Sequence, residues 1–212
     1  MRNIPVFTTE YGAASLFLQE IPYRQSANIK LQATQEPEAL LAECISFCRA
    51  CGAERICASG HPVLEKYPLE TAVIEMQRSA EGLPQTDAAL FPVLPETAPQ
   101  WREIHNRRMA DVPNAAFMLP TDEKKLIETG DGYFIHRDGQ LLGIGRAAGD
   151  TIDLVISVVP GAGQDVLLAL ASALTADIVR LTVAHNNHRA IRLYERLGFL
   201  KTREISRWHR VL

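Results

Sequence analysis

The sequence predicts an α/β (α+β) fold, and three observations in its second half support that prediction. Residues 132–147 contain two alternating strands around Asp138-Gly139, a dipeptide that favours a type I′ hairpin turn. Residues 151–160 (TIDLVISVVP) form a continuous apolar run, which indicates a strand buried on both faces. Helical and strand patterns then alternate to the end of the chain, so antiparallel strands are combined with helical crossovers.

A stretch rich in proline separates the two halves of the chain. Four prolines interrupt residues 82–99 and prevent a continuous helix there. We therefore place a domain boundary near residue 84 and expect two regions, 1–84 and 85–212. Within the stretch, residues 88–94 (AALFPVL) can form a short edge strand, because proline is tolerated at a sheet edge.

The remaining elements follow from periodicity and from helix start and stop signals. Before the boundary we expect strands and helices at residues 14–21, 28–34, 36–52, 54–59, 61–67 and 70–77, of which 36–52 and 61–67 are helical. After it we expect helices at residues 98–112, 122–129, 164–175 and 188–197, and further strands at 177–184 and 199–212.

Residues 54–77 and 179–208 share the order strand, short helix ending in a Tyr, strand. This similarity suggests that the first half is a reduced copy of the second.

Composition and charge exclude several classes of protein. The chain has 212 residues, 47% of them hydrophobic and 22% charged, with a formal net charge of −3. A balance of this kind lacks the basic footprint of a nucleic-acid or anionic-membrane binder. No apolar run approaches the roughly 18 residues that span a bilayer, and the first twelve residues lack an apolar signal-peptide core. We expect a soluble, cytoplasmic protein with no nucleic-acid or membrane partner.

The most informative segment is residues 187–199, NHRAIRLYERLGF. Asn187 directly follows a predicted buried strand and is a favourable N-cap, so its side chain can satisfy a free backbone donor or reach towards a ligand. Tyr194 lies about two helical turns further along, roughly on the same side of the helix. Gly198 is expected to end the helix with a positive φ. The helix is expected to pack through its apolar positions, which are Ala190, Leu193 and Leu197.

The pattern N-x-x-A-I-x-L-Y-x-x-x-G-F resembles motif B of the GNAT acetyltransferase superfamily position for position. The expected order of elements over residues 88–212 is similar to that superfamily as well. The resemblance implies a GNAT-like mixed, mostly antiparallel sheet with helices on both faces, preceded by a shortened GNAT-like half. It also implies an enzyme that moves an acetyl group from acetyl-CoA to a primary amine of a small molecule, amino acid or peptide by direct attack. Tyr194 would be the catalytic general acid, because a phenol can protonate the departing thiolate.

The resemblance further implies where acetyl-CoA binds. Its pantetheine would pair with the exposed strand backbone from Ile156 to Val159. Its diphosphate would lie on free N–H groups at the start of the next helix, where the helix dipole favours anions. The cofactor-binding positions implied in this way are Ile156, Val158, Gly161, Gly163, Gln164, Asp165, Val166 and Asn187.

The implied diphosphate loop, residues 160–168 (PGAGQDVLL), departs from the family pattern Q/R-x-x-G-x-G/A. Gly163 falls where Gln or Arg is usual, and Val166 falls on a glycine. Gly161 and Gly163 still permit a close backbone approach, and Gln164 offers a side-chain donor. Asp165 suits the helix dipole but would repel a phosphate. The Gly-Ala-Gly run is equally consistent with an ordinary strand-to-helix turn.

No general base stands out. The carboxylates nearest to the implied site are Asp150, Asp153, Glu128 and Asp131, and we interpret all four as solvated surface acids. Two histidines, His185 and His188, flank the motif and are further weak candidates. Geometry rather than spacing must select a base among them.

Four cysteines lie close together, at positions 44, 48, 51 and 57. The spacing Cys44-x-x-x-Cys48-x-x-Cys51 is that of the iron–sulfur motif of radical SAM enzymes, which gives a remote alternative function. However, the three cysteines fall within the predicted helix 36–52 and on one of its faces, which favours packing in the core. We expect no metal site.

A second alternative is a non-catalytic GNAT-like module that binds CoA or another ligand, or that mediates an interaction. The Asn187/Tyr194 pair favours the enzyme, whereas the unusual loop favours the module. The first half lacks both a glycine loop and a matching Asn…Tyr pair, so its expected role is structural. The expected partners are acetyl-CoA and an amine acceptor, with the chain as a monomer or homodimer.

Overall fold

The computed structural model describes residues 5–110, 112 and 115–212, and its contacts divide the chain into two compact units. Unit 1 runs up to Val73 and also includes Glu204–Leu212, whereas unit 2 is Ile74–Arg203. Strands β5 (Leu69–Ser79) and β11 (Leu200–Arg210) each contribute residues to both units. These units are defined by contacts, and the domain boundary expected near residue 84 stays a prediction.

Unit 1 is built on a sheet with strand order β1-β2-β3-β4-β11. Its further elements are β1 (Val6–Thr9), β2 (Gly12–Phe17), α1 (Ile21–Arg24), β3 (Ser26–Thr34), α2 (Pro37–Ala50), β4 (Arg55–Ser59) and the 3₁₀ helix η1 (Pro62–Lys66). Strands β3 and β4 are parallel over five residue pairs, from Ser26↔Arg55 to Lys30↔Ser59. Helix α2 crosses between them and buries Leu40 in the core. The sequence did not predict β1 or α1, both of which are short.

Unit 2 is built on a sheet with strand order β5-β10-β9-β8-β7-β6. Its further elements are β6 (Ala89–Pro92), α3 (Ala98–Arg108), α4 (Pro120–Thr129), β7 (Gly132–Arg137), β8 (Gln140–Ala148), β9 (Thr151–Ser157), α5 (Gly163–Ser172), β10 (Ile178–Ala184) and α6 (His188–Arg196). Strands β6 to β9 are antiparallel neighbours, and β9 is parallel to β10. The predicted helix over 98–112 ends at Arg108, and Asp111 lies outside the described residues.

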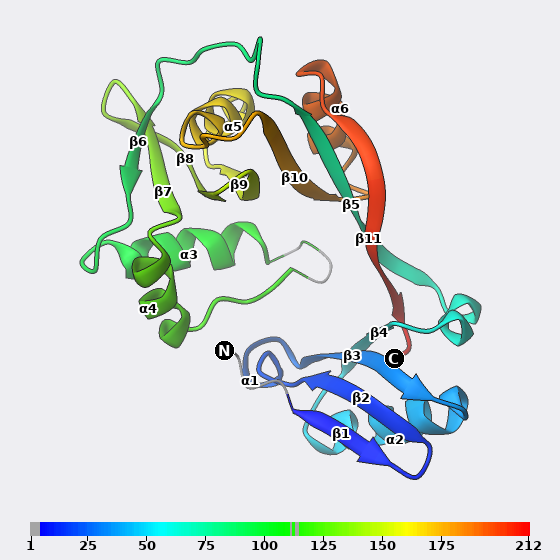
Figure 1. The fold of residues 1–212 in the computed structure, drawn as a ribbon. Coiled ribbons are helices and arrows are strands. Elements are labelled where there is room, and N and C mark those ends of the chain that lie inside the picture. The colour runs from blue at the N-terminus through cyan, green and yellow to red at the C-terminus, as the bar shows by residue number, and fades with distance from the viewer. Residues whose placement is uncertain (1–4, 111, 113–114) are drawn as a thin grey trace. The chain divides into compact units, whose positions relative to one another are not determined.

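Helices cover both faces of the sheet in unit 2 (Figure 1). On one face, Ile135 and Ile152 pack with the buried side chains of α5 and α6. On the other face, Phe134 and Ile156 pack with Trp101 of α3 and with α4. Neighbouring residues of a strand, such as Phe134 and Ile135, point to opposite faces, so the two cores share the same strands. In β9 a register shift against β8 lies between Ile152 and Leu154, so Ile152 and Ile156 reach opposite faces. The predicted fold class, a mixed and mostly antiparallel sheet with helices on both faces, is confirmed.

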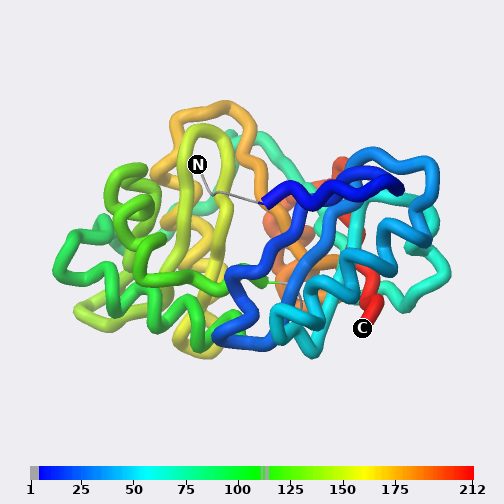
Figure 2. The backbone as a smooth tube through the Cα atoms, turned by 90° about the horizontal axis from the view of Figure 1, so that it is seen from below, coloured from blue at the N-terminus to red at the C-terminus, as the bar shows by residue number. Residues whose placement is uncertain are grey.

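The predicted hairpin is present at β7–β8 and can be followed as the yellow-green loop in Figure 2. Asp138 and Gly139 have φ values of 52° and 78°, as a type I′ turn requires. The predicted edge strand is also present, because β6 ends the strand order of this sheet. In the described part of the chain, no helix is long and apolar enough to span a bilayer.

The expectation for residues 151–160 is wrong in one respect. Strand β9 forms there, but only Ile152 and Ile156 are buried, and Asp153 is exposed. The other residues of the strand are half-buried. The reason lies in its pairing with β10, which the described residues maintain for only two pairs, Arg180↔Thr151 and Leu181↔Ile152. From Val155 onwards the strand lines a cavity instead of pairing with β10.

Candidate functional site

A cavity of about 650 Å³ in unit 2 lies where β9 and β10 part. It is lined by the second half of β9, by the turn that leads into α5 and by one side of α6. On its other edge β9 pairs with β8 as far as Gly143↔Ser157, so the strand is held in place while its β10-facing edge is open. Open backbone N–H and C=O groups at a strand edge can pair with the amides of an extended ligand.

The turn between β9 and α5 forms one end of this cavity. Gly161 has a φ of 88°, and a Cβ atom there would meet nothing within 4 Å, so the backbone conformation alone explains the glycine. Helix α5 begins at Gly163 after Ala162, which offers no side-chain cap. In the described structure, no backbone acceptor pairs with the N–H groups of Gly163, Gln164 and Asp165. Free donors at the positive end of a helix dipole favour an anion.

Two predicted loop residues lie away from the cavity. The Asp165 carboxylate is 3.2 Å from the Arg137 guanidinium and accepts a hydrogen bond from the Thr86 hydroxyl at 3.2 Å. Its charge is therefore partly balanced on the outer side of α5 and does not face a ligand in the cavity. Val166 is completely buried against β8, where a Cβ atom at Gly143 would lie 2.7 Å from it. The side chain of Val166 therefore belongs to the core and not to the cavity.

Helix α6 forms the opposite wall, and its N-terminus has the predicted cap. The Asn187 side-chain oxygen accepts a hydrogen bond from the backbone N–H of Ala190 at 3.1 Å. Gly198 has a φ of 85° after the end of the helix. The predicted packing face is confirmed but incomplete. Leu197 is buried as expected, and Ala190 and Leu193 pack against the same core while also lining the cavity. Two further side chains of the helix, Ile191 and Tyr194, are more deeply buried than Ala190 and Leu193.

Tyr194 combines deep burial with access to the cavity. Only 6% of its surface is exposed, and its ring lies 6.1 Å from that of Phe199. Burial raises the pKa of the Tyr194 phenol to about 12, because the ionised form would lose its hydration. Below about pH 12 the phenol therefore keeps its proton.

Arg78 stabilises the C-terminal end of α6, because its guanidinium donates hydrogen bonds to the carbonyls of Leu197 and Glu81.

Four arginines are the only charged side chains in the described lining of the cavity. Arg189, Arg192 and Arg196 project from α6 at helical spacing, and Arg108 comes from the end of α3. Arg108 donates to the carbonyl of Val158 at 2.8 Å, and the Ser157 hydroxyl donates to the next carbonyl along the chain at 2.5 Å. The α6 arginines could have been noticed from their spacing within residues 187–199, whereas no sequence signal indicated Arg108.

The predicted site residues divide into two groups. Six of them line the cavity, namely Val158, Gly161, Gly163, Gln164, Asn187 and Tyr194. The remaining three, Ile156, Asp165 and Val166, have side chains that the cavity lining does not include. Ile156 is buried in the core beneath α3, and only its backbone can face the open strand edge. The roles of all nine residues stay predictions.

None of the candidate bases belongs to the described lining of the cavity. Asp150 pairs with Arg180 and Thr151, Glu128 pairs with Lys124, and Asp153 is exposed. Asp131 is not a solvated acid, because it is buried against Arg146 and Thr129. Burial alone would raise the pKa of its carboxyl, but the hydrogen bonds and charge of these partners outweigh burial and lower it.

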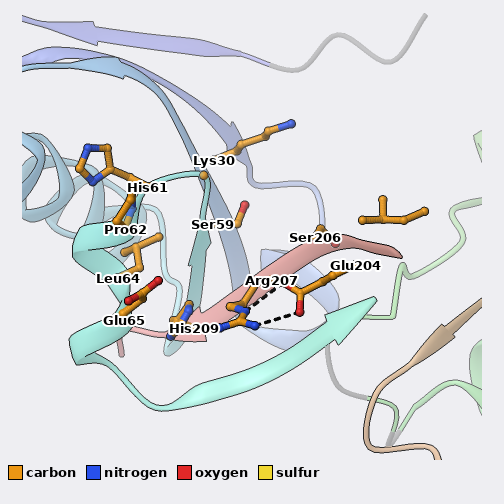
Figure 3. A pocket seen from close by; sticks show the side chains of 12 residues that line it. Lys30, Ser59, His61, Pro62, Leu64, Glu65, Glu204, Ser206, Arg207 and His209 are labelled. Carbon is orange, nitrogen blue, oxygen red and sulfur yellow. Dashed lines mark hydrogen bonds and ion pairs between the residues drawn. The ribbon is translucent and has the colours of Figure 1, made fainter. Parts of the chain in front are cut away.

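Unit 1 contains a second cavity, of about 540 Å³, beside the end of β4 (Figure 3). Its charged lining is mixed, because it includes Lys30 and Arg207 as well as Glu65 and Glu204. Arg207 is already neutralised, because it forms two hydrogen bonds with Glu204 at 2.9 and 3.0 Å. Mixed and internally paired charges give this cavity no net preference for an anion, in contrast to the cavity of unit 2.

The cysteine cluster lies in unit 1, where Cys44 and Cys48 are completely buried in the core. Burial raises the pKa of their thiols, to about 12 and about 11 respectively, so both remain protonated at neutral pH. The core interpretation is confirmed for these two residues and wrong for Cys51, which is exposed because α2 ends at Ala50. Among the described residues, no three His, Cys, Asp or Glu side chains are grouped to hold a metal ion.

Comparison with known proteins supports the fold. No family model matches the chain, and no curated protein matches it. Among solved structures, the chain is similar to a GCN5-related N-acetyltransferase from Sphaerobacter thermophilus, with a TM-score of 0.56 and 13% identity over 93% of this chain and 75% of that chain. The fold is that of the GCN5-related N-acetyltransferases.

Two further structures extend the likeness. A tandem GNAT protein from the clavulanic acid biosynthesis pathway has a TM-score of 0.54 and 15% identity over 94% of this chain and 78% of that chain. A conserved protein of unknown function from Staphylococcus epidermidis has a TM-score of 0.61 and 12% identity over 99% of this chain and 94% of that chain. Identities this low establish a shared fold and not a shared activity.

Proposed function

We propose that the chain is an acyltransferase that moves an acetyl group from acetyl-CoA to a primary amine. The observation that carries this proposal is the parting of β9 and β10 after two residue pairs, which opens a strand edge into a cavity. That cavity also holds a helix N-terminus with free donors and the buried phenol of Tyr194. A strand edge suits a pantetheine arm, and the helix N-terminus suits a diphosphate.

The arginines of α6 support CoA as the donor. CoA carries a diphosphate and a further phosphate, and Arg189, Arg192 and Arg196 place three positive charges along one wall of the cavity. Guanidinium groups bind phosphates through paired, charge-assisted hydrogen bonds. Gln164 adds one side-chain donor at the start of α5. These side chains compensate for a loop that lacks the usual Gln or Arg.

The chemistry assigned to this chain is proton transfer and positioning. Acetyl-CoA supplies the activated thioester when bound. The amine nitrogen bonds to the acetyl carbon while the carbon–sulfur bond breaks, and the amine gives up one proton to solvent. Tyr194 donates its proton to the departing sulfur and regains one from water. A phenol pKa of about 12 keeps this proton in place across the physiological range.

One observation favours the alternative of a non-catalytic module. The carbonyls of Val158 and Val159 already accept hydrogen bonds from Arg108 and Ser157. These carbonyls belong to the backbone stretch predicted to pair with pantetheine. In that alternative, the cavity binds a ligand without transferring an acyl group.

Two measurements separate these functions. Titration of the protein with acetyl-CoA in a calorimeter should give saturable heat, and the absence of heat at millimolar acetyl-CoA would contradict both CoA binding and catalysis. Mass spectrometry of a mixture of amines incubated with protein and acetyl-CoA should then detect an acetylated amine together with free CoA. Saturable binding without any acetylated product would favour the non-catalytic module.

A further inference from the structure

The four arginines of the cavity share one property: no carboxylate of the described residues forms an ion pair with them. Within the described residues, Arg108, Arg189, Arg192 and Arg196 form no ion pair. Most other arginines of unit 2 do: Arg102 pairs with Glu123, Arg137 with Asp87 and Asp165, Arg146 with Asp131, Arg180 with Asp150, and Arg203 with Glu75. The described lining contains neither Asp nor Glu. The described part of the lining is therefore positively charged throughout.

These arginines reach the cavity from opposite faces of the sheet. Helix α6 shares its core with α5, through residues such as Ile191. Helix α3 packs on the other face, where Trp101 and Ile104 meet Ile156 of β9. The three α6 arginines thus belong to the wall assigned above to the donor phosphates. Arg108 stands apart from them, at the end of β9 on the face of α3.

Arg108 is held in place with most of its donors unused. One guanidinium nitrogen donates to the Val158 carbonyl at 2.8 Å, which fixes the group beside the open strand edge. A guanidinium has five N–H donors, so the remaining ones can form a bidentate pair with a carboxylate or phosphate. A purely cationic amine would meet only positive charge in the described lining, and it would be repelled.

On the basis of the proposed acetyltransferase function, we propose that the acceptor is an amine that also carries an anionic group, a carboxylate or a phosphate, which binds Arg108. The amine of such a molecule can approach the thioester while its anion is held at the side of α3. Polyamines and lysine-rich peptides are then poor acceptors, because nothing in the described lining balances their charge.

The first test compares matched amines that differ only in the anion. Phenylalanine is paired with phenethylamine, O-phosphoethanolamine with ethanolamine, and spermidine serves as a polycation. With acetyl-CoA as donor, the amine that carries the anion should have a kcat/KM ~10-fold or more above that of the amine without it, in at least one of the two pairs. The phenylalanine and phosphoethanolamine arms show whether a carboxylate or a phosphate is preferred. Higher kcat/KM for both phenethylamine and ethanolamine than for their anionic partners, or the highest kcat/KM for spermidine, would overturn the proposal.

The second test changes Arg108. Arg108→Gln should lower kcat/KM for the preferred anionic amine by ~10- to 100-fold, mainly through the acceptor KM, while the dissociation constant for acetyl-CoA changes little. Arg108→Glu should reverse the preference within the matched pair. Arg107→Gln is the control, because Arg107 is a neighbouring exposed arginine outside the cavity lining, and its acceptor preference should match the wild type.

The outcomes separate this proposal from the function on which it rests. If wild-type protein binds no acetyl-CoA, the proposed function fails, and the acceptor assignment fails with it. If acetyl-CoA binds and amines are acetylated, but Arg108→Gln and Arg107→Gln behave alike, only the acceptor assignment is overturned.

Discussion

Unit 1 and unit 2 share the order strand, helix, strand, helix in β3-α2-β4-η1 and β9-α5-β10-α6, yet among the described residues only the parallel strands of unit 2 part early. In both units two parallel strands flank a helix, β3 and β4 around α2 and β9 and β10 around α5. Strand β4 pairs with β3 along its whole length of five residues, whereas β10 pairs with β9 at two positions. A ladder that is complete has no free backbone groups for a ligand. A site is possible in unit 2 because the pairing of β9 and β10 ends early, and the order of elements alone does not create one.

The helices that follow the second parallel strand of each unit, β4 and β10, also differ in length. In unit 1, β4 is followed by the five-residue 3₁₀ helix η1, which ends next to Tyr67. In unit 2, β10 is followed by α6, whose nine residues carry Tyr194 into the core. The repeat suggested by residues 54–77 and 179–208 is thus present in the order of elements. The shorter helix of unit 1 cannot place a tyrosine two turns from its start.

The largest expected effect tests these two tyrosines against each other. Tyr194→Phe should lower turnover by ~100-fold or more, because the general acid is lost, while the dissociation constant for acetyl-CoA stays within about twofold. Tyr67→Phe is the matched control in unit 1 and should leave turnover unchanged. Steady-state kinetics and calorimetry on both variants check this. Equal turnover in the two variants would remove Tyr194 from the mechanism.

The next effect concerns two glycines with positive φ at the ends of parallel strands. At Gly60, after β4, a Cβ atom would lie 2.3 Å from the Leu31 carbonyl oxygen. At Gly161, after β9, it would meet nothing within 4 Å. Gly60→Ala should therefore lower the free energy of unfolding by ~2–4 kcal/mol, and Gly161→Ala by ~1–2 kcal/mol from the backbone conformation alone. Urea denaturation of both variants measures the difference, and a larger loss for Gly161→Ala would contradict it.

A smaller expected effect concerns acetyl-CoA binding and the different charges of the unit 1 and unit 2 cavities described above. Arg192→Gln should weaken acetyl-CoA binding by ~10-fold, because an unpaired arginine of the unit 2 cavity is lost. Arg207→Gln removes an equal charge from the unit 1 cavity, where Glu204 already pairs with it, and should have no effect on binding. Titrations at low and high salt should show that salt weakens binding to the wild type more than to Arg192→Gln. Equal losses in both variants would indicate a general charge effect instead of a defined site.

The contrast between the units also explains what the sequence could predict. Local chemistry was readable, since the Asn187 cap, the positive φ of Gly198 and the hairpin turn depend on residues next to one another. The point where β10 leaves β9 depends on packing across the sheet and has no local signal. The same is true of Arg137, which draws Asp165 away from the cavity.

The orientation of α6 shows this limit most clearly. Its apolar positions predicted a packing face through Ala190 and Leu193, and both side chains do pack against the core, but they are only partly buried. Ile191 and Tyr194 are buried more deeply, and Ala190 and Leu193 border the cavity as well as the core. Periodicity identifies an amphipathic helix, but it cannot distinguish a helix face that packs in the core from one that borders a binding site.

The smallest expected effect uses the buried tyrosine as a pH probe of unit 2. At pH 8 the phenol of Tyr194 is protonated in both the folded and the unfolded chain, so its ionisation contributes nothing. Above pH ~10 the unfolded phenol ionises, while the folded one keeps its proton until about pH 12, so rising pH favours unfolding. Wild-type protein should lose ~0.8 kcal/mol more than Tyr194→Phe between pH 8 and pH 10.5. Chemical denaturation of both proteins at the two pH values measures this difference. An identical fall in the free energy of unfolding for both proteins would mean that the phenol is solvated in the folded protein. The contrast between Tyr194 and Tyr67 would then no longer rest on burial.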